Sequence, residues 1–213
     1  MKFNRKMLII IFCIFAVLMY LSSSVRITAF DSNMYKAFFT AKNIYADLPD
    51  ADERAGNILD YLNGKEALNT TFFNEKEAAH MKDVRALFAF SLATLLISML
   101  VLLAIAVFAF MKKDIDLLWK CALFGGISGV LFAVLLFLLS LNFSSFFASF
   151  HKVLFTNSLW LMNPLTDKII ALLPESFFRM AAKRIFLTFG VLSFGMMAAG
   201  IIIRWMGKRM KNV

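Results

Sequence analysis

The 213-residue chain is more apolar than a water-soluble domain, in which roughly half of the residues are apolar. Hydrophobic residues make up 61% of it and its mean hydropathy is +0.74, so the composition predicts a polytopic membrane protein of the all-α class. The formal net charge is +9, but the basic residues border the apolar stretches instead of forming one patch. This arrangement argues against nucleic acid as a partner and indicates contact with the anionic head groups of a phospholipid bilayer.

Four apolar stretches are each long enough to cross a hydrocarbon core about 30 Å thick as a helix. The first could instead be a signal peptide, because basic residues precede it and serines follow it, but it has no A-x-A cleavage site. We interpret it as a retained span. The sequence thus predicts one integral membrane domain over residues 1–213, with spans at 7–25, 86–111, 121–147 and 185–205.

Basic residues are enriched on one side of this predicted topology. The N-terminal tail, the loop at residues 112–120 and the stretch from Arg204 onward together hold ten Lys and Arg but only two acidic residues. The segments on the other side hold 13 basic and 12 acidic residues, so they are nearly neutral. By the positive-inside rule, both termini and the middle loop should be cytoplasmic, while residues 26–85 and 148–184 should face outward.

The two outward segments differ in character. Residues 26–85 show helical patterns at 34–45 and 51–62, separated near Pro49, and are predicted to form a helical cap. Residues 148–184 are rich in aromatic side chains and contain two prolines, which is typical of a segment in the membrane interface. Glycines in the spans are expected to allow close helix packing, namely Gly125, Gly126, Gly129, Gly190, Gly195 and Gly200.

The two histidines of the sequence lie at the ends of predicted spans. His80 precedes the second span by a few residues and His151 follows the third, so both should stand at the outer face of the membrane. Because imidazole titrates near pH 6.5, such a pair suits acid and base catalysis on a molecule that resides in the membrane. Glu77 and Asp83 lie three residues on either side of His80, where helical spacing allows either carboxylate to hold the imidazole tautomer.

Other interpretations of these residues remain open at this point. The stretch around His80 could be a solvated, capped helix start in a non-enzymatic membrane protein that binds or assembles with a partner. His80, His151 and Glu77 could also serve a metal-dependent membrane hydrolase, but helical metal sites usually repeat the Glu-x-x-His motif, and His151 has no such acid beside it. A solute pathway is disfavoured, because the spans hold almost no ionisable side chains.

Three stretches resemble the signatures of a known family: DYLNG at residues 60–64, FFNEKEAAHMKDVRAL at 72–87 and FHKVLFTNSLWLMNPLTDKIIALLPESFF at 150–178. In order and spacing they are similar to the four-span bacterial membrane family that includes the lipoprotein intramolecular transacylases. The E-x-x-H-M-x-D-V and F-H-x(3)-F patterns are the most specific parts. The resemblance runs over nearly the whole chain.

This resemblance implies an enzyme of the bacterial cytoplasmic membrane that acts on lipoproteins with a diacylglyceryl group on their N-terminal cysteine. It would move the sn-2 acyl chain from the glycerol oxygen to the α-amine of that cysteine, giving the lyso form of the lipoprotein. Such chemistry requires no metal and no cofactor. Both donor and acceptor belong to one substrate, which removes the entropy loss of bringing two molecules together.

On this hypothesis His80 and His151 are the catalytic pair. The resemblance implies that one acts as base and the other as acid, and either histidine could take either role. Asp83 or Glu77 would orient His80. Three further side chains could assist with the oxyanion or the lipid head group: Asn157, Trp160 and Lys152.

Overall fold

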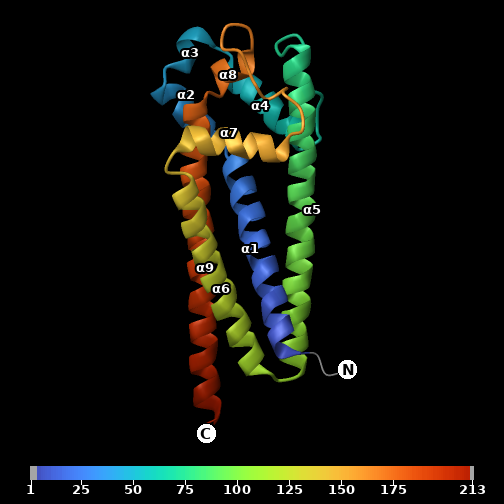
Figure 1. The fold of residues 1–213 in the computed structure, drawn as a ribbon, viewed down its shortest axis with the longest axis vertical. Helices are drawn as coiled ribbons and strands as arrows, with labels where there is room; N and C mark the ends of the chain where they lie inside the picture. Colours follow the sequence, from blue (N-terminus) through green and yellow to red (C-terminus); the bar gives the residue numbers. More distant parts are fainter. Residues whose placement is uncertain (1–3, 212–213) are drawn as a thin grey trace. The chain divides into compact units, whose positions relative to one another are not determined.

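The computed structural model of the protein describes residues 4–211, and every regular element in that range is an α-helix. Figure 1 shows the chain from α1 to α9. In chain order the helices are α1 (Arg5–Ala29), α2 (Ser32–Ala41), α3 (Ile44–Asp47), α4 (Ala51–Leu62), α5 (Glu75–Met111), α6 (Ile115–Leu139), α7 (Phe143–Leu154), α8 (Lys168–Leu172) and α9 (Glu175–Lys211). The predicted all-α fold class is confirmed.

Four of the described helices, α1, α5, α6 and α9, are long and apolar enough to cross a membrane. They contain 25, 37, 25 and 37 residues. At a rise of about 1.5 Å per residue, even the shorter two exceed a hydrocarbon core of roughly 30 Å. The prediction of four membrane-spanning helices is confirmed.

The chain folds as two compact units, each assembled from separate parts of the sequence. The span unit comprises Met1–Val25, Leu92–Leu138 and Ile185–Val213, and the site unit comprises Arg26–Ser91 and Leu139–Arg184. Within the span unit, the four long helices run side by side (Figure 1). Both histidines belong to the site unit.

Close packing of α6 and α9 in the span unit depends on glycine. A Cβ atom on Gly126 would lie 2.5 Å from the backbone nitrogen of Met197, and one on Gly200 would lie 2.5 Å from that of Leu123. Real Cβ atoms essentially never make contacts under 3.0 Å, so these helices approach at distances that only glycine permits. Of the six glycines predicted to pack, Gly126, Gly129 and Gly200 have such contacts under 3.0 Å. A Cβ on Gly125 would lie 3.0 Å from the side chain of Phe12, and Gly190 and Gly195 face open space.

The third predicted span differs from the structure at its C-terminal end. We predicted one helix over 121–147, but α6 ends at Leu139 and a separate helix, α7, begins at Phe143. Asn142 separates them, because its side-chain oxygen accepts the backbone N–H of Ser145 over 3.2 Å and caps α7. The phenylalanines of α7 keep the sequence apolar past this break, so hydropathy alone does not detect it.

The helical pattern at 34–45 is likewise divided in two. α2 ends at Ala41, and α3 begins at Ile44 after Asn43, which adopts a left-handed backbone conformation with φ of 54°. Asparagine is one of the residues that tolerates this conformation, so it ends one helix and redirects the chain. The pattern at 51–62 corresponds to α4.

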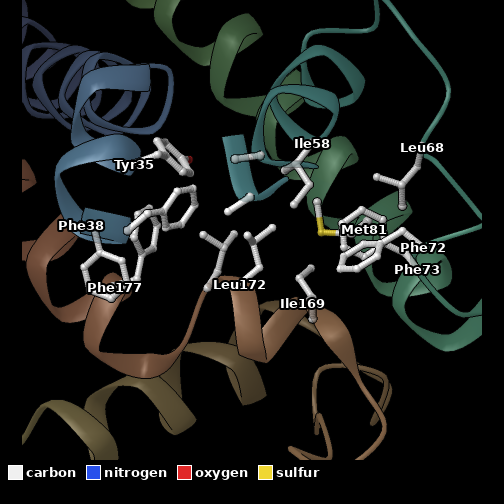
Figure 2. Packing of buried hydrophobic residues seen from close by; sticks show 14 of the residues in the cluster. Tyr35, Phe38, Ile58, Leu68, Phe72, Phe73, Met81, Ile169, Leu172 and Phe177 are labelled. Atoms are coloured by element: carbon white, nitrogen blue, oxygen red, sulfur yellow. The ribbon is translucent and has the colours of Figure 1, made fainter. Parts of the chain in front are cut away.

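A buried apolar cluster holds the helices of the site unit together, as Figure 2 shows. Phe177 at the start of α9 packs against two rings of α2, with centroid distances of 4.8 Å to Tyr35 and 5.3 Å to Phe38. Met81 of α5 and Leu172 of α8 are buried in the same cluster. Since Met81 follows His80 directly, this core fixes the rotation of α5 that presents the histidine.

Candidate active site

The first turn of α5 is set by a reciprocal pair of hydrogen bonds. The backbone N–H of Glu77 donates to Oδ1 of Asn74 over 2.9 Å, and the backbone N–H of Asn74 donates to Oε2 of Glu77 over 2.8 Å. This is a capping box, which satisfies two backbone donors at the start of a helix. It fixes where α5 begins and therefore where His80 lies, about one turn further on.

Glu77 is fully buried, and both of its carboxylate oxygens accept backbone N–H groups. Besides the bond from Asn74, Oε1 accepts the N–H of Ile169 in α8 over 2.6 Å. Sequence spacing made Glu77 a candidate to orient His80. In the structure its oxygens instead join α5 to α8, which is how a buried carboxylate becomes acceptable in a protein interior.

His80 lies in the charged first turns of α5, before the apolar stretch that starts at Ala86. It is only 8% exposed, and its buried Nδ1 has no hydrogen-bond partner among residues 4–211. The pKa of His80 is lowered to about 4, chiefly by burial and then by the nearby His151, with Lys76 acting in the same direction and Asp83 opposing them. The ring is therefore neutral at neutral pH.

His151 lies on α7, with its ring centroid 6.2 Å from that of His80 and the two planes tilted by 33°. Its Nδ1 is 2.7 Å from the carbonyl oxygen of Phe147. Because a carbonyl only accepts, Nδ1 must carry the proton, and the lone pair of the neutral ring lies on Nε2. Burial lowers the pKa of His151, and the bond to Phe147 partly offsets that effect.

Aromatic rings surround the histidine pair. Trp160 stacks on His151 with centroids 5.0 Å apart and planes 29° apart. Phe155 contacts both histidines, at 5.0 Å from His80 and 5.6 Å from His151, and Phe147 lies 4.3 Å from His151. The environment is thus apolar and of low dielectric, where hydrogen bonds and charges interact more strongly than in water.

The remaining predicted site residues occupy the edge of this cluster. Asp83 accepts a hydrogen bond from Nδ2 of Asn157 over 2.9 Å, so this pair joins α5 to the loop that follows α7. Asp83 acts on His80 through its charge. Lys152 follows His151 on α7, is exposed, and has neither an ion pair nor a side-chain hydrogen bond within the described part of the chain.

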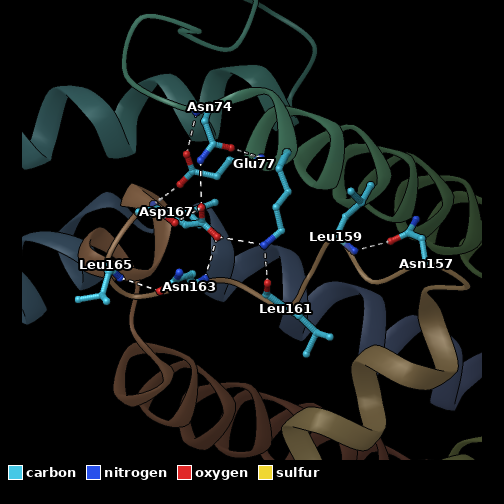
Figure 3. Close-up of polar contacts among 11 residues, drawn as sticks. Asn74, Glu77, Asn157, Leu159, Leu161, Asn163, Leu165 and Asp167 are labelled. Carbon is cyan, nitrogen blue, oxygen red and sulfur yellow. Dashed lines mark hydrogen bonds and ion pairs between the residues drawn. The ribbon is translucent and has the colours of Figure 1, made fainter.

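Sequence reasoning missed a polar network beside the histidines, drawn in Figure 3. Asp167 is 5% exposed and accepts hydrogen bonds from the side chain of Asn74 over 3.0 Å and from the backbone N–H of Asn163 over 2.7 Å. It also pairs with Lys76 at 3.1 Å. The bond to Asn163 and these partners lower the pKa of Asp167 to about 2. The Asn-Pro dipeptide of the NPLTD stretch indicates a turn. The residues at the start of α5 that bond to Asp167 leave no pattern in the sequence around it.

The donor set does not favour a metal. Within residues 4–211, no three His, Cys, Asp or Glu side chains gather so that they could hold a metal ion. Glu77, the acid considered for a metal-dependent hydrolase, is occupied by two backbone amides. A cavity of about 510 Å³ between α4 and residues 66–73 is lined by neither histidine. What the site offers is two neutral imidazoles at close range, which suits proton transfer.

These observations define a class of protein: a polytopic α-helical membrane protein with a buried histidine pair among aromatic rings. The family model for lipoprotein intramolecular transacylase, Lit, matches residues 10–178. The chain therefore belongs to the lipoprotein intramolecular transacylase family and is a multi-pass membrane acyltransferase. The family resemblance found in the sequence is confirmed.

Solved structures share the fold. An in meso structure of the membrane-integral lipoprotein intramolecular transacylase Lit from Bacillus cereus is 22% identical, with a TM-score of 0.87, over 97% of this chain and 98% of that chain. Variants of that protein with one histidine changed to arginine or to alanine have TM-scores of 0.79, at 20% and 19% identity. The match to the arginine variant covers 97% of this chain and 94% of that chain. The match to the alanine variant covers 98% of this chain and 96% of that chain. No curated protein matches the sequence significantly.

Proposed function

We propose that the protein moves the sn-2 acyl chain of a diacylglyceryl lipoprotein to the α-amine of the lipoprotein's N-terminal cysteine, with His80 and His151 as the catalytic pair. One observation carries this proposal: two histidine rings from separate helices lie 6.2 Å apart in an aromatic, largely buried environment. Family membership supplies the reaction class, and the pair supplies one ring that can move the protons and a second that can donate a hydrogen bond to the oxyanion.

The reaction breaks the ester bond between the acyl carbonyl carbon and the sn-2 glycerol oxygen, and it forms an amide bond to the cysteine nitrogen. The attacking amine loses one proton and the departing glycerol oxygen gains one, so no proton is consumed overall. The acyl group stays on the same molecule throughout. Positioning of the two reacting groups therefore supplies a large part of the rate.

His151 suits the role of the base. Its Nδ1–H is donated to the carbonyl of Phe147, so the lone pair on Nε2 is free to accept a proton from the amine. Its lowered pKa keeps the ring neutral and receptive at neutral pH. The Phe147 carbonyl then stabilises the imidazolium, as the orienting acid does in a catalytic triad.

His80 suits the role of a neutral hydrogen-bond donor. With a pKa of about 4 it stays uncharged, and a neutral imidazole can donate its N–H to the oxyanion of the tetrahedral intermediate. The His151 imidazolium then returns its proton to the departing glycerol oxygen, so both rings finish neutral. Trp160 and Phe155 exclude water from the intermediate, while Asn157 and Lys152 stand at the edge of the site to meet the glyceryl or peptide part of the substrate.

We place this chemistry at the outer face of the bacterial cytoplasmic membrane, with both termini in the cytoplasm. Two features support that placement. His80 stands six residues before the apolar stretch of α5 that starts at Ala86, and the net positive charge gathers in the termini and the loop at residues 112–120. The partners are lipoproteins as substrates and the phospholipid bilayer as surroundings. Nucleic acid has no place in this scheme.

Mass spectrometry of a lipoprotein's N-terminal peptide tests the proposal. The chain is expressed in a host that makes only diacylated lipoproteins, beside His80→Ala, His151→Ala and the control Lys82→Ala. Lys82 lies on the same helix as His80 and is exposed. We expect the parent and the control to yield the lyso form, with an amide-linked acyl chain on the cysteine nitrogen, and neither histidine variant to do so.

Three results would contradict it. A parent that is well expressed in the membrane but leaves the diacylglyceryl cysteine unchanged rejects the reaction. A histidine variant that keeps parental activity rejects that residue's role. Loss of activity of the purified protein after chelation of divalent metals, with recovery on adding one metal back, would favour metal-dependent chemistry instead.

A further inference from the structure

The loop between α7 and α8 carries residues that contact the histidine pair, yet it has no regular structure of its own. Trp160 of this loop stacks on His151, and Asn157 bonds to Asp83. Residues 155–167 contain no helix. The position of Trp160 therefore depends on side-chain bonds that tie the loop to its neighbours, since a loop without them is free to move.

Lys76 provides the central bond. It lies in the first turn of α5, four residues before His80 and so on the same side of that helix. Its Nζ donates to the carbonyl oxygen of Leu161 over 2.5 Å and pairs with Oδ2 of Asp167 at 3.1 Å. Leu161 is the residue directly after Trp160, so the lysine fixes the backbone beside the ring that packs on His151.

Asp167 secures the other end of the loop. Its Oδ2 also accepts the backbone N–H of Asn163, and its Oδ1 accepts the side-chain N–H of Asn74 at the start of α5, as Figure 3 shows. The Lys76–Asp167 pair is thus an ion pair with further hydrogen bonds around a carboxylate that is 5% exposed. The Lys76 side chain is 38% exposed, so Asp167 is the buried partner, and removing the lysine leaves its carboxylate with neutral hydrogen-bond donors alone.

We propose that Lys76 and Asp167 form a latch that positions Trp160 against His151, and that closure of this latch sets the catalytic rate. The inference rests on the proposed function, in which the His151 ring accepts the proton of the attacking amine. Lys76 and Asp167 are positioning residues and touch no substrate. A ring misplaced by about 1 Å can lower a rate by about two orders of magnitude, so an open latch lowers kcat.

The test combines kinetics with the fluorescence of Trp160. Three variants of the full-length protein are purified. Lys76→Met removes the charge and its hydrogen bonds, and Lys76→Arg restores a cation able to bond to the carbonyl oxygen of Leu161 and to Oδ2 of Asp167. Lys82→Met is the exposed control. Rates are measured with a diacylglyceryl peptide. Acrylamide quenching of Trp160 is measured in a Trp119→Phe, Trp205→Phe background that keeps parental activity.

We expect Lys76→Met to lower kcat by roughly tenfold or more with KM changed by less than about threefold, and to make Trp160 more accessible to acrylamide. Lys76→Arg should recover both properties, and Lys82→Met should match the parent. A Lys76→Met protein with parental kcat, or one that loses kcat while Trp160 quenching stays parental, would overturn the latch.

Two further comparisons cover a variant that does not fold and a parent that shows no activity. If Lys76→Met does not fold, Asp167→Asn is judged by the same two readouts, because it removes the charge while keeping the size of the side chain. If the parent itself transfers no acyl group, the proposed function fails separately. The latch is then tested by quenching alone. Stronger acrylamide quenching of Trp160 in Lys76→Met, reversed in Lys76→Arg, supports the latch, and unchanged quenching in Lys76→Met rejects it.

Discussion

At the scale of single residues, the site depends on buried polar groups that have hydrogen-bond or ion-pair partners. Glu77 is fully buried and accepts two backbone N–H groups, while Asp167 is nearly as buried and faces a lysine. His80 contrasts with them, because its Nδ1 has no partner within residues 4–211. With a second histidine ring 6.2 Å away, this unpaired nitrogen fits a group that bonds to a substrate.

Replacing Glu77 with Gln should destabilise the site unit. Glutamine has one acceptor oxygen, so its amide N–H would face one of the two backbone donors, at a loss of roughly 1–3 kcal/mol. Hydrogen exchange of the amides of Asn74 and Ile169 should become faster in this variant. The exposed neighbour Glu75, changed to Gln, is the matched control. Equal protection in both variants would show that Glu77 does not join α5 to α8.

The two histidines should titrate below the ordinary histidine value. Burial lowers the pKa of both, to about 4 for His80. Because the unfolded chain binds these protons near pH 6.5, the fold has its full histidine-linked stability above that pH and loses it as the pH falls toward about 4. Histidine-labelled protein in micelles gives two ring resonances by NMR, assigned with His80→Gln. A midpoint at or above 6.5 for either one would contradict the burial that the structure describes.

At the scale of helices, glycine and asparagine decide how elements meet and end. Gly126 and Gly200 let α6 and α9 approach at backbone distance, and Asn142 and Asn43 divide apolar or helical stretches that hydropathy treats as continuous. Small side chains thus control packing in a membrane bundle, where apolar side chains gain little from leaving lipid.

Gly126→Ala should weaken the contact between α6 and α9. Its new methyl group would lie 2.5 Å from the backbone of Met197, so the helices must separate, at a loss of about 1–3 kcal/mol. Thermal unfolding in detergent should show a lower midpoint. Gly190→Ala is the control, because a Cβ there meets no atom within 4 Å. If both variants unfold at the parental temperature, α6 and α9 are not packed through Gly126.

The sequence was informative about helices and much less so about partners. Span number, the α4 pattern and the choice of His80 and His151 as a pair all follow from local composition and from topology. The roles of Glu77 and Asp167 do not, because their partners lie about 90 residues away along the chain. The break at Asn142 is a local signal, but the leucines before it and the phenylalanines after it conceal it.

At the scale of the whole molecule, the chain alternates between its two units. The site unit takes its two parts from either side of a long stretch of the span unit. The membrane-spanning helices therefore connect the two halves of the site covalently. The proposed orientation requires both halves to lie on the outer side of the membrane and the connecting loop at residues 112–120 to lie on the inner side.

Cysteine labelling of intact cells checks this orientation. In a chain with Cys13→Ala and Cys121→Ala, we expect Lys65→Cys to react with a membrane-impermeant maleimide from outside, and Lys112→Cys to react only after permeabilisation. Both positions are exposed, so accessibility alone does not separate them. Labelling of Lys112→Cys together with protection of Lys65→Cys in intact cells would show that the chain has the opposite orientation.

The hydrogen bond from Ile169 to Glu77 spans 92 residues, and this separation has a consequence for biosynthesis. The ribosome makes roughly 5–20 residues per second, so a newly synthesised Glu77 waits on the order of 5–20 s for its partner to be synthesised. During that interval the carboxylate must remain in water, and the first half of the site is an unfinished surface. In the proposed orientation, a nascent chain stalled before α8 should therefore expose apolar residues on the outer side of the membrane and be a preferred substrate for the proteases that act there.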